Sequence, residues 1–142
     1  MGGAAGIHRP RQARHALTYE DARTHNIPLG SGVVMVFDET ADLPHHLYEL
    51  ARFFAHESCG KCFPCQLGTQ RQMELLGRMR HGDVRPDDWA TLEDVGFAMT
   101  HTSLCGLGQT AASAVLSARQ FTRAMSNEQV CSLLIANCSL IP

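Results

Sequence analysis

The sequence predicts a mainly α-helical protein in which a leader with one β-strand precedes a bundle of four helices. Four segments between residues 38 and 123 carry apolar residues at the three- and four-residue spacing of a helix that buries one face. The leader contains a single run of mostly β-branched residues. With 142 residues, 44% of them hydrophobic and 18% charged, the chain can bury a core. We therefore divide it into a leader (residues 1–37), a helical domain (38–123) and a tail (124–142).

The expected strand lies at residues 33–37, behind Gly30 and Gly32. Its β-branched content and its glycine boundary favour a buried strand over a helix. Residues 1–30 are rich in Gly, His, Arg and Pro and show no sustained periodicity, which is typical of turns and loops. A single strand needs a partner for its backbone groups. We therefore expect either a segment before residue 30 to pair with it, or a piece of chain that this sequence lacks.

The helical domain is expected to begin with a capped helix, because Asp42 can serve as its cap and Pro44 suits its first turn. The expected helices run from residue 44 to near residue 58, from about residue 64 to residue 82, from residue 86 through residue 99, and from about residue 109 to residue 121. The tail could form a short covering helix. The prediction is thus a four-helix bundle with its connections at residues 58–63, 82–86 and 100–108.

The strongest chemical signal is a run of three cysteines, Cys59, Cys62 and Cys65, separated by two residues each. This spacing lets three thiolates converge on one face of a [4Fe-4S] cubane, one for each iron, and a fourth iron then needs a thiolate from elsewhere. Cys105 supplies that thiolate from a second, glycine-rich loop at residues 103–108. An antiparallel pair of intervening helices would bring the two loops together. Glycines beside the ligands let backbone N–H groups approach the sulfurs, which raises the reduction potential.

Zinc is the main alternative at these cysteines. Structural zinc sites usually combine two separated Cys-x-x-Cys pairs or matching histidines, whereas this sequence has three cysteines and a distant fourth. The spacing therefore favours iron–sulfur over zinc, with metal-free thiols as a third possibility. Cys131 and Cys138 lie outside the pattern and are interpreted as packing residues or incidental thiols. His56 and His101 flank the two loops, where surface positions are the commoner outcome.

Composition and missing motifs exclude several functions. The formal net charge of −2 argues against nucleic-acid binding, which needs clustered positive charge. No apolar run approaches the ~20 residues of a membrane helix, and the start of the chain lacks a secretory h-region, so we expect a cytoplasmic protein without direct membrane insertion. No phosphate-cradling glycine motif joins a strand to a helix, and no nucleophile arrangement is present. We assign no catalytic residue, and no unaided binding of nicotinamide or flavin.

The two cysteine loops resemble those of one protein family. Residues 57–65, followed by Gly68 and Thr69, are similar to the cluster loop of the NADH-binding flavoprotein subunits, and residues 103–110 are similar to the second loop of that family. The family includes the flavoprotein subunit of respiratory complex I and relatives in NAD-linked formate dehydrogenases and NAD-reducing hydrogenases. Residues 30–39 also resemble the strand that leads into the cluster domain of the family, and residues 2–7 resemble a glycine-rich stretch of its preceding ubiquitin-like domain.

The resemblance covers roughly residues 2–123 and implies both a fold and a path of electron transfer. The leader would be the remnant of a β-grasp (ubiquitin-like, SLBB-type) domain, and residues 38–123 a helical-bundle [4Fe-4S] domain. The implied cluster ligands are Cys59, Cys62, Cys65 and Cys105. In the family, this cluster receives electrons that NADH has delivered to FMN and passes them to another cluster.

The resemblance also implies partners. The family binds FMN and NADH in a Rossmann-like domain that this sequence lacks, so these cofactors are expected only on a missing domain or a separate flavin- and NADH-binding subunit. A [2Fe-2S] thioredoxin-like subunit and other iron–sulfur subunits are the further expected partners, in a complex that could sit peripherally on the cytoplasmic side of a membrane. The alternatives are a zinc-stabilised, non-redox interaction module and a truncated, inactive fragment.

Overall fold

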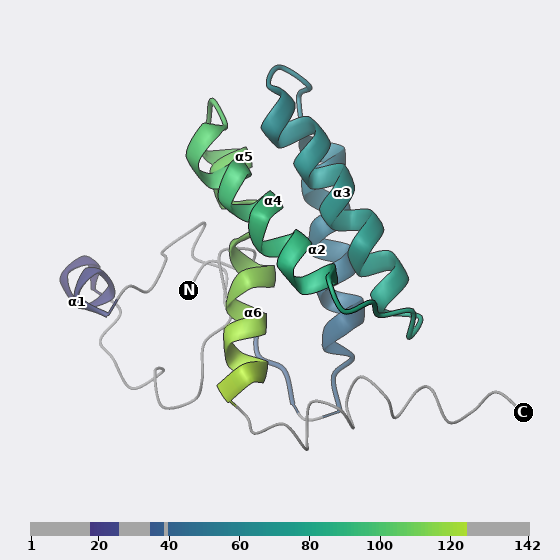
Figure 1. Ribbon diagram of the computed structural model, residues 1–142. Helices are drawn as coiled ribbons and strands as arrows, with labels where there is room; N and C mark the ends of the chain where they lie inside the picture. The colour runs from purple at the N-terminus through teal and green to yellow at the C-terminus, as the bar shows by residue number, and fades with distance from the viewer. Residues whose placement is uncertain (1–17, 26–34, 39, 125–142) are drawn as a thin grey trace, which may run out of the picture.

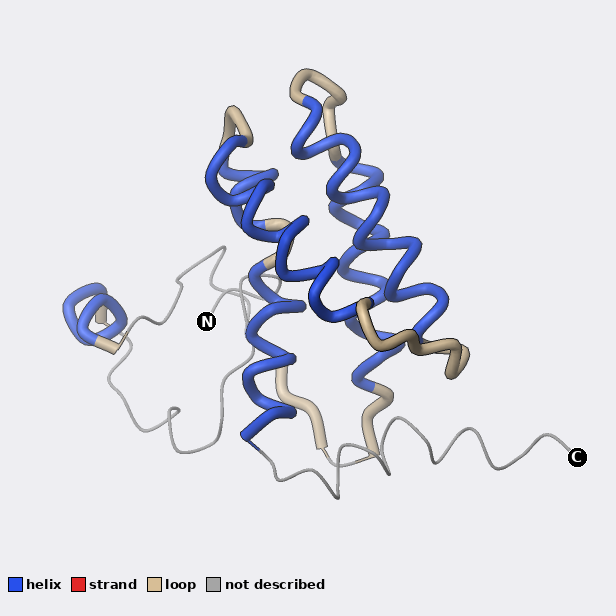
Figure 2. Tube along the Cα trace, in the orientation of Figure 1, coloured by secondary structure: helices blue, strands red, loops and turns tan. Residues whose placement is uncertain are grey.

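The computed structural model describes residues 18–25, 35–38 and 40–124, with side chains up to residue 119. Every regular element in these residues is a helix (Figure 2). The helices are α1 (Tyr19–Thr24), α2 (Leu43–Glu57), α3 (Phe63–Met79), α4 (Asp88–Thr102), α5 (Gly106–Thr110) and α6 (Ser113–Ala124). The prediction of a mainly helical protein is therefore confirmed. None of the described helices is long and apolar enough to cross a membrane.

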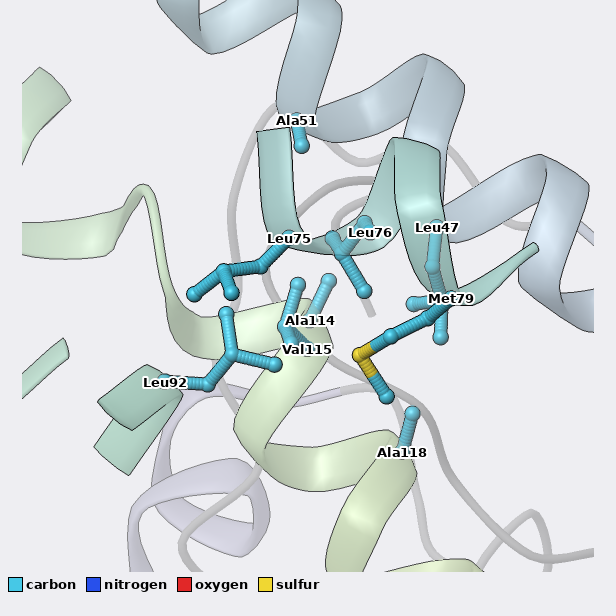
Figure 3. Close-up of a cluster of buried hydrophobic side chains, with 9 residues drawn as sticks. All are labelled: Leu47, Ala51, Leu75, Leu76, Met79, Leu92, Ala114, Val115 and Ala118. Carbon is cyan, nitrogen blue, oxygen red and sulfur yellow. The ribbon is translucent and has the colours of Figure 1, made fainter. Parts of the chain in front are cut away.

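Helix α3 is central to the bundle: it packs against α2 on one side and against α4 on the other, and α6 contacts both α2 and α4 (Figure 1). The core between these helices consists of buried aliphatic side chains (Figure 3). Its members are Leu47, Ala51, Leu75, Leu76, Met79, Leu92, Ala114, Val115 and Ala118. Small alanines on α6 let that helix approach closely, so four helices share one apolar centre.

The predicted start of the first helix is confirmed. Asp42 caps α2, because its carboxylate accepts a hydrogen bond of 3.0 Å from the backbone N–H of His45. Pro44 lies in the first turn, where its missing N–H costs nothing. The helix ends at Glu57, and the extended backbone of its C-cap Ser58 (φ −65°, ψ 120°) turns the chain into the first cysteine loop. The cap and the apolar stripe thus determine where that loop begins.

The leader differs from the prediction in two ways. Residues 35–37, the described part of the expected strand, form no strand, and Val36 is 90% exposed. No described segment pairs with them, and an unpaired strand has no partner for its backbone groups. Residues 33–34 and most of the leader lie outside the described residues, so no β-grasp remnant is seen in the described part. The leader instead contains the unpredicted α1, which Thr18 caps through the N–H of Asp21 at 3.2 Å.

The expected helix at residues 109–121 is also wrong in one respect, because it is two helices. Helix α5 ends at Thr110 and α6 begins at Ser113. The carbonyl of Ala111, at the break, accepts a buried hydrogen bond of 3.0 Å from the side-chain amide of Gln72 on α3. This long-range contact stabilises the change of direction. Residues 125–142, most of the predicted tail, lie outside the described residues.

Candidate metal centre

The two cysteine loops lie at the same end of the bundle, although about forty residues separate them in the sequence. In Figure 1 the α2–α3 connection and the α4–α5 connection both occupy the upper end of the molecule. Contact between them is close: a Cβ on Gly108 would lie 2.9 Å from the Cβ of Cys65. The backbone N–H of Leu104 also faces the Cys62 thiol. The antiparallel course of α3 and α4 therefore brings the loops together, as the sequence predicted.

Each cysteine has a defined backbone position. Cys59 is exposed and precedes Gly60, whose positive φ of 72° makes the turn toward α3. Cys62 and Cys105 are the N-cap residues of α3 and α5, both with extended backbone and neither with a side-chain cap hydrogen bond. Cys65 is buried in the first turn of α3. All four are free thiols, available as ligands.

Hydrogen-bond donors surround the thiols of Cys62 and Cys65. The N–H of Leu104 and then that of Cys65 hold the pKa of the Cys62 thiol below its ordinary value of 9.0, because N–H dipoles stabilise the thiolate. The hydroxyl of Ser58 lies 3.4 Å from the sulfur of Cys65. The hydroxyl of Ser103 is buried and also acts to lower the pKa of the Cys62 thiol, although no acceptor in the described part of the chain meets full hydrogen-bonding geometry with it. The groups around Cys62 therefore favour its negatively charged thiolate.

These features fit an iron–sulfur cluster. Among the described residues, no three His, Cys, Asp or Glu side chains come close enough together to hold a single metal ion. A [4Fe-4S] cluster asks for a different arrangement, because each thiolate binds a different iron and the sulfurs stand apart around the cubane. The unpartnered hydroxyl of Ser103 and the inward N–H of Leu104 are donors of the kind that cluster sulfurs accept.

Buried polar residues support the first loop from below, and the sequence reasoning did not find them. Thr69 is fully buried, and its hydroxyl donates to the carbonyl of Cys65 at 2.8 Å. Gln72 is buried one turn further and bonds to Ala111, next to the second loop's helix. Both follow Cys65 at helical spacing on a face that is otherwise apolar. Polar residues at such positions are the signal that could have indicated a supporting role.

The flanking histidines lie on the surface. His56 is exposed beside Glu57, and the exposed His101 contacts the ring of Phe97, with 4.3 Å between ring centroids. The surface positions expected for them are therefore confirmed. Cys131 and Cys138 lie outside the described residues, and their interpretation as packing or incidental thiols stays a prediction.

Comparison with known proteins identifies the family of this site. The family description "NADH-ubiquinone oxidoreductase-F iron-sulfur binding region" matches residues 45–129, a range that contains both cysteine loops. The chain belongs to this family. The resemblance to NADH-binding flavoprotein subunits is thereby confirmed, and so is the prediction of an iron–sulfur binding region.

Individual relatives agree with the family match. NADH dehydrogenase [ubiquinone] flavoprotein 1, mitochondrial, of Dictyostelium discoideum is 31% identical over 96 residues, which is 68% of this chain and 20% of that protein. An NADH-quinone oxidoreductase subunit of Streptomyces coelicolor is 33% identical over 114 residues, 80% of this chain and 25% of the relative. The chain thus spans about a fifth to a quarter of the length of these relatives.

This chain also shares its fold with part of a protein of known structure. A chain of an NAD+-reducing [NiFe]-hydrogenase in its H2-reduced state superposes with a TM-score of 0.77 at 31% sequence identity. The match covers 94% of this chain and 22% of the hydrogenase chain. The helical arrangement seen here is therefore that of part of a larger redox subunit.

Proposed function

We propose that this chain carries one [4Fe-4S] cluster on four cysteines and relays electrons from NADH-reduced FMN to further iron–sulfur clusters. The ligands would be Cys59, Cys62, Cys65 and Cys105. One observation carries the proposal: the thiol of Cys62 faces the N–H of Leu104, directly beside Cys105. Thiolates from both loops can therefore reach one cofactor, as a fourth ligand for the three-cysteine motif requires.

The bound cluster would supply reversible one-electron transfer. The chain's own residues hold it and adjust its surroundings: the cysteines bind the irons, and the N–H of Leu104 stabilises negative charge at sulfur. Large apolar side chains are exposed near the loops, with Phe63 and Leu104 both 77% exposed. A redox partner that covered them would both exclude water and come close to the cluster.

We assign FMN and NADH binding to a separate domain or subunit, because the matched region of the relatives is the iron–sulfur region. The chain would then be a component of an NADH dehydrogenase, an NAD-linked formate dehydrogenase or an NAD-reducing hydrogenase, and not catalytic alone. Residues 38–123 would form its [4Fe-4S] domain and residues 1–37 the remnant of a β-grasp domain. A [2Fe-2S] thioredoxin-like subunit is a further proposed partner, in the cytoplasm.

Anaerobic reconstitution with iron and sulfide tests this function. We expect a broad brown absorbance, about four irons per chain, and an EPR signal after reduction. Cys105→Ser should lose most of the iron and of the signal, because the fourth iron loses its thiolate. Cys131→Ser, a cysteine outside the motif, is the matched control and should keep both.

Metal analysis of the anaerobically purified protein separates the alternatives. Retention of zinc with no uptake of iron would overturn the proposal in favour of a zinc-stabilised interaction module. A folded chain that takes up neither metal would be an inactive fragment. Iron uptake that Cys105→Ser leaves unchanged would show that the fourth ligand is another residue.

A further inference from the structure

Ser103 has an unusual hydrogen-bonding state. Its side chain is 7% exposed, and the hydroxyl has no hydrogen-bond partner in the described part of the chain. Its backbone groups are both paired, since its N–H donates to the carbonyl of Met99 at 3.2 Å and its carbonyl accepts from the Gln109 side chain at 3.1 Å. A buried hydroxyl without a partner has lost its hydrogen bonds to water and gained none in exchange, which is unfavourable. Of the polar groups of Ser103, only the hydroxyl therefore lacks an acceptor at full hydrogen-bonding geometry among the described residues.

The position of Ser103 is fixed by tight packing. A Cβ on Gly108 would come within 2.6 Å of the Cβ of Ser103 and within 2.9 Å of the Cβ of Cys65. Only a glycine at position 108 leaves room for the serine beside the first loop. The Ser103 hydroxyl is also among the groups that lower the pKa of the Cys62 thiol, after the N–H groups named above. Ser103 thus lies between the cysteines of both loops.

Sulfur is the acceptor that this place offers. We propose that the Ser103 hydroxyl donates a hydrogen bond to a sulfur of the bound cluster, either the Cys62 thiolate or an adjoining sulfide, and raises its reduction potential. This role rests on the [4Fe-4S] cluster proposed above. The reduced cluster carries one more negative charge than the oxidised one, so the hydrogen bond is stronger in the reduced state. Ser103 is a tuning residue and not a ligand.

Ser58 in the other loop has a comparable contact. Its hydroxyl lies 3.4 Å from the Cys65 sulfur, so it already has a sulfur partner without the cluster. The bundle therefore places one serine hydroxyl from each loop beside a cysteine at the start of α3: Ser58 beside Cys65, and Ser103 beside Cys62. Ser103 differs because its hydroxyl lies near Cys62 but meets full hydrogen-bonding geometry with no acceptor in the described part of the chain, which makes it the sharper test.

The experiment compares Ser103→Ala with wild type by anaerobic redox titration of the reconstituted full chain, monitored by EPR. Loss of the hydrogen bond should lower the ratio of reduced to oxidised cluster at a fixed potential about three- to tenfold, where tenfold equals about 59 mV for one electron. Ser103→Thr, which keeps the hydroxyl, should restore the wild-type potential. Ser117→Ala on α6, which runs away from the loops (Figure 1), is the control and should titrate like wild type.

An unchanged potential in a fully loaded Ser103→Ala protein overturns the role of the hydroxyl while leaving the cluster proposal intact. If Ser103→Ala does not assemble a cluster, the Ser103→Thr variant decides between a role of the hydroxyl and a role of packing at this position. A loaded threonine variant with wild-type potential supports the hydrogen bond. Loss of the cluster there too would show that packing against Gly108 governs this position, and would overturn the proposal. Absence of a cluster from wild type would instead refute the proposed function.

Discussion

Gly68 on α3 shows how a single residue brings the two loops together. A Cβ at this position would lie 2.6 Å from the Sδ of Met99 on α4, and Met99 is completely buried. The missing side chain therefore lets α3 and α4 approach each other one turn below Cys65. The contact spans helices that the two cysteine loops adjoin, so it contributes directly to the geometry of the site.

We expect Gly68→Ala to destabilise the protein. Alanine favours a helix interior by about 0.5–1 kcal/mol over glycine, but overpacking of a full core costs about 1–3 kcal/mol. Met99 is completely buried, so it would have to shift within the packed core, and the second effect should win. Urea unfolding followed by circular dichroism measures the net change.

Gly77→Ala is the matched control on the same helix. There the new Cβ would be 3.1 Å from the half-buried ring of Tyr48, which can shift slightly. This variant should be neutral or more stable, by at most about 1 kcal/mol. A Gly68→Ala protein as stable as Gly77→Ala would contradict the steric argument.

At the scale of elements, a buried ion pair holds the α3–α4 turn. Asp88 at the start of α4 is 4% exposed and accepts from the backbone N–H of Arg85 at 2.7 Å and from the guanidinium of Arg78. Burial acts to raise the pKa of Asp88, but these donors outweigh it and hold the pKa below its ordinary 3.8. The turn positions α4 antiparallel to α3 and so places both loops at one end.

The lowered pKa gives a signed pH dependence. The carboxylate contributes stability that is complete above the unfolded pKa of about 3.9 and is lost as the pH falls through the lower folded pKa. Asp88→Asn should reduce the free energy of unfolding at neutral pH by roughly 2 kcal/mol, because a neutral amide replaces the buried carboxylate that accepts from the Arg78 guanidinium and from the Arg85 N–H. The variant should also show a shallower loss of stability than wild type below about pH 4.

Urea titrations from about pH 7 to about pH 2.5 measure both effects. Asp94→Asn removes an exposed acid from the same helix and serves as the control. It should change the free energy of unfolding at neutral pH by no more than about 0.5 kcal/mol. It should also leave the loss of stability below about pH 4 the same as in wild type. Equal behaviour of the two variants would mean that the Asp88 contacts do not stabilise the turn.

The elements differ in how far the sequence determines them. Local signals sufficed for α2, since the cap Asp42 and the proline that follows lie next to its apolar stripe. The break between α5 and α6 falls at two alanines, which are good helix formers, and it depends on Gln72, 39 residues earlier. Helix α1 is only six residues long with one buried side chain, so it has no periodicity to read. Long-range contacts and short length explain these failures.

The residues of the candidate site also differ in how far the sequence alone determines them. The spacing of Cys59, Cys62 and Cys65 is a local property of the chain, so the sequence alone could propose these three as ligands. The approach of the Cys105 loop instead depends on the packing of α3 against α4. The unpartnered state of Ser103 could not be predicted, since it depends on Gly108 and on Cys65 across two loops. Residues 33–37 had the composition of a strand, but a strand also needs a pairing partner, which composition does not reveal.

At the scale of the whole molecule, the proposed cluster would join two connections of the bundle. Cys59, Cys62 and Cys65 follow α2, whereas Cys105 follows α4 (Figure 1). The main core lies between α2, α3, α4 and α6 and does not include the loops themselves. A group bound by both loops in the folded state, and by neither in the unfolded chain, stabilises the fold through linkage.

Removal of the cluster should therefore lower the stability of the whole bundle. We expect loaded wild type to unfold at a higher urea concentration than cluster-free wild type, by at least ~3 kcal/mol in free energy, in anaerobic titrations followed by the helical circular dichroism signal. Cys105→Ser should unfold like the cluster-free protein whether or not iron and sulfide are supplied, because the second loop then lacks its ligand. If loaded and cluster-free wild type unfolded together, the folded and unfolded chains would bind the cluster equally well, as only the three cysteines of the first loop, which are close in sequence, could do. The core of α2, α3, α4 and α6 would then be sufficient for the fold, and Cys105 would have to be withdrawn as a ligand.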